Sequence, residues 1–162
     1  NYEKVLEHDD GNKTALQRLG MLAAEQGNDE EAEHFLRRAF HLDPDHPDVL
    51  LRLGFVLIRQ GKPDLAISML SRAVALEPER VAAHRFLGIA CSSIGWRQAA
   101  EVQFRRAFEL DGKDSETAFN MAVLMASATP PRMDEAKKWY RRARDLGNAG
   151  DPGLDELFGL EN

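Results

Sequence analysis

Cysteine is almost absent from this chain of 162 residues, and its scarcity excludes two classes of small protein. Cys91 is the only cysteine. A single thiol forms no intrachain disulfide framework and supplies no CxxC pair of the kind that holds structural zinc. The composition is otherwise that of a folded, surface-charged protein, with 43% hydrophobic and 30% charged residues. We therefore expect one ordinary domain that is stabilised by an apolar core.

Long apolar runs and an excess of positive charge are also missing. No window approaches the roughly 18 consecutive apolar residues that span a bilayer, so we expect no membrane insertion. The sequence has 21 Lys and Arg residues against 27 Asp and Glu residues, a net charge of −6. A non-specific nucleic-acid binder needs a cationic surface to displace counterions from phosphates, so we expect no nucleic-acid partner.

The chain begins at Asn1 without Met, in what reads as the middle of a helix. We interpret it as an excised piece of a longer protein, from which a targeting signal could have been removed. The cytoplasm is the favoured compartment, but the sequence does not determine it.

A period of 34 residues dominates what is present. One helix stop recurs at this interval, at Leu42-Asp43-Pro44, Leu76-Glu77-Pro78 and Leu110-Asp111-Gly112. Several columns of small residues keep the same interval: Gly20, Gly54 and Gly88; Gly27, Gly61 and Gly95; Ala32, Ala66 and Ala100; Ala39, Ala73 and Ala107. Agreement among independent columns indicates an internal structural repeat.

Each copy of the period predicts two helices separated by a turn. In the first copy, Leu16, Leu19 and Ala23 keep the spacing of one helix face. Gly27 ends that helix, because glycine tolerates the left-handed conformation that follows a helix C-terminus. The second helix ends before Pro44, since proline disfavours helical geometry in the residue before it.

These columns resemble the tetratricopeptide repeat. The resemblance implies an all-α, right-handed solenoid of stacked antiparallel helix pairs, whose first helices line a concave groove. The expected copies are residues 13–46, 47–80 and 81–114, followed by a degenerate fourth copy at 115–148. Residues 1–12 match the second helix of a preceding copy, and residues 149–162 form a linker and a capping helix.

The resemblance also implies a surface that binds protein. The first-helix positions that face the groove in this family are occupied by a mixture of apolar, polar and basic residues. The expected partner-binding residues are Gln17, Met21, Leu51, Arg52, Phe55, Ile58, Arg59, Arg85, Ile89, Phe119, Asn120 and Val123. Members that capture chaperone tails carry Lys and Asn where this chain has Gln17 and Met21, which argues against that ligand. We expect instead a peptide with apolar anchors and one or two carboxylates.

No arrangement of residues predicts catalysis, a cofactor or a metal site. His41, Asp43, Asp45, His46 and Asp48 lie close together, but they occupy a turn between copies whose equivalents lack histidine. His84 and Cys91 fall on core stripes and are expected to be packed. A recurring basic column, Lys4, Arg38, Arg72, Arg106 and Arg142, is expected on a solvated face. We therefore expect no enzyme activity.

The expected function is that of a scaffold or adaptor that binds another protein. One alternative is self-association through the repeat faces and the tail, where Leu154, Leu157 and Phe158 keep helical spacing. Another alternative is a chaperone that holds unfolded clients in the groove.

Overall fold

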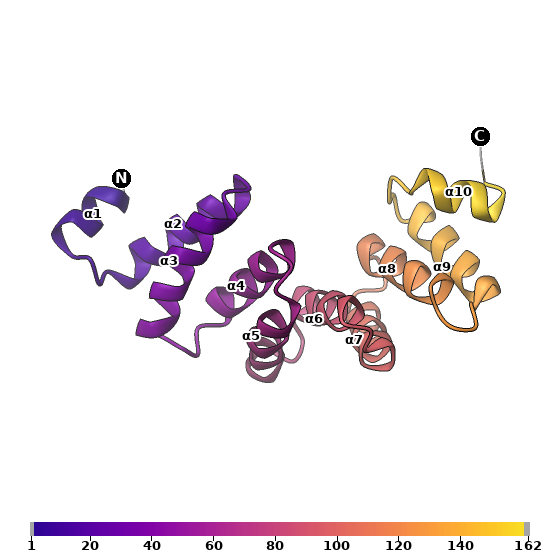
Figure 1. Cartoon of the computed structure of the whole chain (residues 1–162), viewed down its shortest axis with the longest axis horizontal. Coiled ribbons are helices and arrows are strands. Elements are labelled where there is room, and N and C mark those ends of the chain that lie inside the picture. Colours follow the sequence, from indigo (N-terminus) through magenta and orange to yellow (C-terminus); the bar gives the residue numbers. More distant parts are fainter. Residues whose placement is uncertain (1, 161–162) are drawn as a thin grey trace.

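The computed structural model describes residues 2–160, which form helices and no strand. Figure 1 shows the helices succeeding one another along an elongated molecule, with the N-terminal and C-terminal ends far apart. The bounds are α1 Tyr2–His8, α2 Lys13–Glu25, α3 Asp29–Leu42, α4 Pro47–Arg59, α5 Pro63–Leu76, α6 Val81–Ser93, α7 Arg97–Leu110, α8 Ser115–Ala126, α9 Met133–Asp145 and α10 Pro152–Phe158. The expected all-α solenoid of stacked helix pairs is confirmed.

Glycine and proline define where the helices begin and end. Pro47 and Pro63 are the first residues of α4 and α5, a position where the missing N–H of proline costs no helical hydrogen bond. Gly27, Gly61 and Gly95 have positive φ angles of 81°, 69° and 80° in the turns inside successive pairs. Residues with a Cβ rarely adopt this conformation, so these glycines allow the sharp reversal between paired helices.

A second set of glycines brings the two helices together in three of the pairs, α2–α3, α4–α5 and α6–α7. A Cβ added to Gly20 would lie 2.7 Å from Cγ of Leu36, and one added to Gly54 would lie 2.5 Å from Cγ of Leu70. The repeat of this contact explains the glycine column found in the sequence. The opposing leucines are fully buried, because they pack directly against the glycine backbone.

The basic column connects three of the helix pairs to the turn that precedes them. Arg38 donates a hydrogen bond of 2.6 Å to the carbonyl oxygen of Asp10. Arg142 donates one of 3.3 Å to the carbonyl oxygen of Gly112. Arg72 pairs with Asp45 at 2.6 Å. The side chains are partly solvated, as expected, but three of them also fix the stacking of neighbouring pairs.

The last pair carries the tail on its outer surface. The ring of Tyr140 on α9 is fully buried and lies 5.5 Å from the ring of Phe158 on α10, between centroids. The Tyr140 hydroxyl donates to Oδ1 of Asp155 at 2.7 Å and accepts from the backbone N–H of Asp151 at 2.8 Å. Lys137 donates to the carbonyl oxygen of Phe158 at 2.6 Å. Side chains from α9 therefore hold both ends of the short α10.

Candidate functional site

The first helices α2, α4, α6 and α8 carry all twelve expected partner-binding residues. We call the surface that these residues form the first-helix face. Most of them are half-buried: Gln17, Met21, Arg52, Phe55, Ile58, Arg85, Ile89, Phe119 and Asn120. Arg59 is exposed, and Val123 keeps 41% of its surface accessible. This distribution leaves apolar and polar atoms of four helices available to a ligand.

Leu51 differs from the expectation. Only 5% of its surface is accessible, and it belongs to the core cluster. The reason lies in α4, where Val49, Leu50 and Leu53 are also buried. Because α4 is packed on several sides, Leu51 contributes little surface to a binding face.

An aromatic pair lies at the centre of the first-helix face. The rings of Phe55 on α4 and Phe86 on α6 are 4.9 Å apart between centroids. The guanidinium carbon of Arg59 lies 4.8 Å from the centre of the Phe55 ring, and that of Arg85 lies 5.3 Å from the centre of the Phe86 ring. Both distances are within the range of cation–π attraction. Sequence reasoning missed Phe86, although it lies 34 residues from both Arg52 and Asn120, in the same column.

The three arginines of this face have intramolecular partners of unequal quality. Arg59 forms an ion pair with Asp29 and donates to the carbonyl oxygen of Ala24 at 2.9 Å. Arg52 lies 3.7 Å from Glu25, and Arg85 lies 3.5 Å from Asp114. The last two separations are long for a charge-assisted hydrogen bond. Arg59 is therefore tied to the fold, whereas Arg52 and Arg85 are loosely paired.

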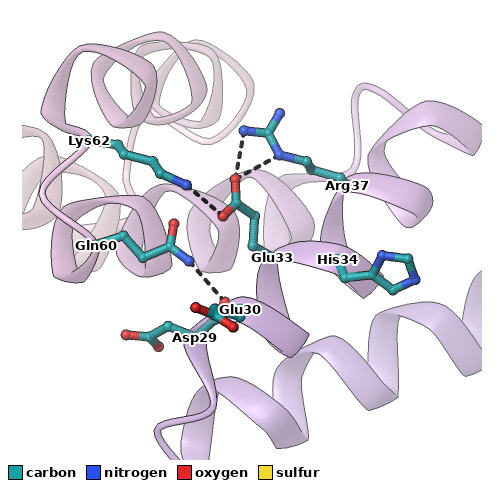
Figure 2. A pocket seen from close by; sticks show the side chains of 7 residues that line it. All are labelled: Asp29, Glu30, Glu33, His34, Arg37, Gln60 and Lys62. Atoms are coloured by element: carbon teal, nitrogen blue, oxygen red, sulfur yellow. Dashed lines mark hydrogen bonds and ion pairs between the residues drawn. The ribbon is translucent and has the colours of Figure 1, made fainter.

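A polar pocket of about 650 Å³ lies elsewhere, where the start of α3 faces the turn before α5. Figure 2 shows the carboxylate of Glu33 between Arg37 and Lys62, with the ring of His34 directed away from it. Oε2 of Glu33 accepts from Lys62 at 2.8 Å, and Oε1 accepts from Nε of Arg37 at 2.8 Å. The residues around the pocket are Asp29, Glu30, Glu33, His34, Arg37, Gln60 and Lys62.

The charge of Glu33 is held by its neighbours. Burial raises the pKa of this carboxyl, but the hydrogen bonds from Lys62 and Arg37, with a further contribution from the nearby Gln60, outweigh that effect and bring the pKa to about 2. Glu101 has an equivalent arrangement with Arg105 and Arg132, at 2.6 Å and 2.8 Å, and its pKa is also lowered. Lys62 and Arg132 both belong to the next helix pair along the chain, so these clusters connect neighbouring pairs.

Residue types that elsewhere act in catalysis or metal binding have structural roles here. His84 is 6% exposed, with Nδ1 2.8 Å from Oε1 of Gln103 and Nε2 3.0 Å from the carbonyl oxygen of Pro78. Cys91 is buried, and burial raises the pKa of its thiol. The structure groups no three His, Cys, Asp or Glu side chains so as to hold a metal ion anywhere in residues 2–160.

Comparison with known proteins agrees with this architecture. The family profile described as "Tetratricopeptide repeat" matches residues 1–50 and again residues 30–89, together more than half of the chain. The chain belongs to the tetratricopeptide repeat family, whose members are protein-interaction modules. A search of curated protein sequences gives no match. In the part of the chain that the structure describes, no helix has the length and apolar character needed to cross a membrane.

Solved structures of the same fold cover most of the chain. YrrB, described as a TPR protein with an unusual peptide-binding site, is 25% identical with a TM-score of 0.79, over 98% of this chain and 78% of YrrB. MamA from Desulfovibrio magneticus RS-1 is 19% identical with a TM-score of 0.82, over 93% of this chain and 84% of MamA. The type IV pilus biogenesis factor PilW is 19% identical with a TM-score of 0.83, over 98% of this chain and 72% of PilW.

Proposed function

We propose that this chain is a protein-interaction scaffold that binds a peptide or protein segment along its first-helix face. It acts by binding, without catalysis. The observation that carries the proposal is the set of accessible apolar side chains on successive first helices, Ile58 on α4, Ile89 on α6 and Val123 on α8. Apolar side chains left accessible on neighbouring elements of a folded protein favour contact with another molecule.

The polar groups on this face suit a polypeptide ligand. Asn120 is half-buried on α8, and its side-chain amide makes no hydrogen bond within residues 2–160. A free amide can donate to and accept from the backbone of a bound peptide. Arg52 and Arg85, being loosely paired, can meet acidic groups. YrrB, which is described as having a peptide-binding site, supports the same class of ligand.

Two matched valine substitutions test this proposal. Val123 on α8 belongs to the first-helix face, whereas Val102 on the second helix α7 is 61% exposed and lies outside it. Peptides are first selected on the wild-type chain from a phage-displayed random library, and their affinities are measured by fluorescence polarisation. Val123→Glu should weaken binding about tenfold or more, because a charge replaces an apolar contact. Val102→Glu should leave binding unchanged. Equal binding to both variants would refute the proposal.

Self-association is the second candidate, and one observation favours it. Leu157 on α10 is 53% exposed, although Leu154 and Phe158 of the same helix face the protein. An isolated leucine on a terminal helix can contact another copy of the chain. Sedimentation at several concentrations tests this, with Leu157→Asp as the variant. A concentration-dependent increase in mass that Leu157→Asp abolishes supports self-association, and a monomer at all concentrations rejects it.

A further inference from the structure

The two arginines that lie over the central aromatic pair differ in how fully the protein uses them. Arg59 has both Asp29 and the carbonyl oxygen of Ala24 as acceptors. Arg85 reaches only Asp114, at 3.5 Å between Nη1 and Oδ1, and its Nε is buried with no hydrogen-bond partner. A guanidinium has five N–H groups. Most of those of Arg85 therefore lack an acceptor within residues 2–160.

Asp114 is not free to improve this contact. Its other oxygen, Oδ2, accepts a hydrogen bond of 2.6 Å from the hydroxyl of Thr117. Asp114 also immediately precedes the first turn of α8, which fixes its backbone. The carboxylate is thus held toward Thr117, and its contact with Arg85 stays a single long one that leaves other N–H groups of Arg85 without an acceptor. No other carboxylate of the described chain pairs with Arg85.

The surroundings of Arg85 indicate which ligand could accept hydrogen bonds from its unoccupied N–H groups. The Phe86 ring holds the guanidinium from one side, which restricts the rotamers that the long side chain can adopt. Ile89 lies one helical turn further along α6 and is half-buried. The neighbouring α8 contributes Val123 with its accessible surface. A positively charged planar group therefore lies one turn away from apolar contacts.

We propose that the partner of this chain is a peptide segment carrying an acidic side chain next to an apolar one, and that Arg85 receives the carboxylate. This inference depends on the proposed function and assigns the chemistry of its ligand. The carboxylate of the peptide pairs with the unoccupied N–H groups of Arg85 in a charge-assisted contact. Its apolar neighbour packs on Ile89 and Val123. Arg59, whose acceptors lie within the fold, contributes structure and no recognition of charge.

The test uses the peptides selected on the wild-type chain. Arg85→Gln removes the charge while keeping a polar side chain of similar reach, and Arg85→Glu reverses the charge. Arg141→Glu, at an exposed position on the second helix α9, makes the same change in net charge as Arg85→Glu, and a larger one than Arg85→Gln, away from the face. Circular dichroism and thermal melting of each variant report whether the fold is retained.

Four results are expected together. The selected peptides are enriched in Asp or Glu beside an apolar residue, and Arg85→Gln weakens them about tenfold or more, as for loss of a hydrogen bond to a charged group. Peptides selected anew on Arg85→Glu lose the acidic preference. Arg141→Glu changes affinity less than about twofold, as for a distant surface charge.

The outcomes separate this inference from the function beneath it. Peptides that depend on Val123 but bind Arg85→Gln as tightly as the wild type would overturn the role of Arg85 and leave the binding face intact. Failure to select any peptide that depends on Val123 would overturn both.

Discussion

Replacement of Glu33 by Gln should reveal how strongly an ion cluster holds neighbouring helix pairs together. The carboxylate lies 2.8 Å from Lys62 of the next pair and 2.7 Å from Nη2 of Arg37, and its side chain is 14% exposed. A pKa lowered from 4.5 to about 2 would correspond to roughly 3 kcal/mol if the whole effect reached the unfolding equilibrium. The cationic partners are about 45% exposed, and solvent screening reduces such contributions several-fold, so we expect a loss of about 1 kcal/mol at pH 7.

The pH dependence of this loss follows from the direction of the pKa shift. Glu33 titrates lower in the folded chain than in the unfolded chain, so its stabilisation is complete above pH 4.5 and disappears as the pH falls toward 2. Urea titrations of wild type and Glu33→Gln at pH 7, 4.5 and 3 measure the difference. The stabilities should converge as the solution becomes acidic. Glu31→Gln, an exposed change on the same helix, should show little of this dependence. A constant difference between wild type and Glu33→Gln at every pH would contradict the argument.

Three further predictions concern packing, the tail and the thiol. Gly88→Ala should destabilise the chain by about 1 kcal/mol, although alanine has the better helix propensity, since the new Cβ would lie 2.6 Å from the buried Phe104 ring. Urea titration measures this loss, with Gly112→Ala as the unobstructed control. An unchanged or raised stability of Gly88→Ala would argue against the close contact. Tyr140→Phe removes the hydroxyl that holds Asp151 and Asp155, so limited proteolysis within residues 147–153 should accelerate; equal cleavage rates would show that α10 is held by other contacts. Cys91 should react with a thiol reagent far more slowly in the folded chain than in the denatured chain, because the residue is 4% exposed and burial raises the pKa of its thiol. Similar reaction rates in the folded and denatured chains would indicate that the thiol is accessible.

The helices and their pairing could be predicted from the sequence because glycine and proline constrain the backbone at their own positions. Gly61 with its positive φ and Pro63 at the start of α5 are constrained by their own backbone chemistry. The contact between Gly54 and Leu70 follows from the same 34-residue register. Such signals need no knowledge of distant parts of the chain, so the helix pairs were predicted from the spacing of a few residue types. The solenoid was implied by the resemblance of that spacing to the tetratricopeptide repeat.

The state of the charged groups could not be read in this way. The pairing of Arg59 with Asp29 depends on how one helix pair is rotated on the next, and the sequence register does not specify that rotation. For the same reason, sequence reasoning predicted the same binding role for Arg52, Arg59 and Arg85. The apolar character of α4 on several sides also concealed that Leu51 is buried. The role of the expected residues in binding stays a prediction.

Site-specific photocrosslinking tests the central claim most directly. A benzophenone amino acid is placed at Val123 on the first-helix face, or at Val102 on the second helix α7, and each protein is irradiated with a peptide selected on the wild-type chain. Our account predicts a covalent peptide adduct at position 123 and none at position 102. An adduct at position 102 alone would place the ligand on the opposite set of helices and contradict the account.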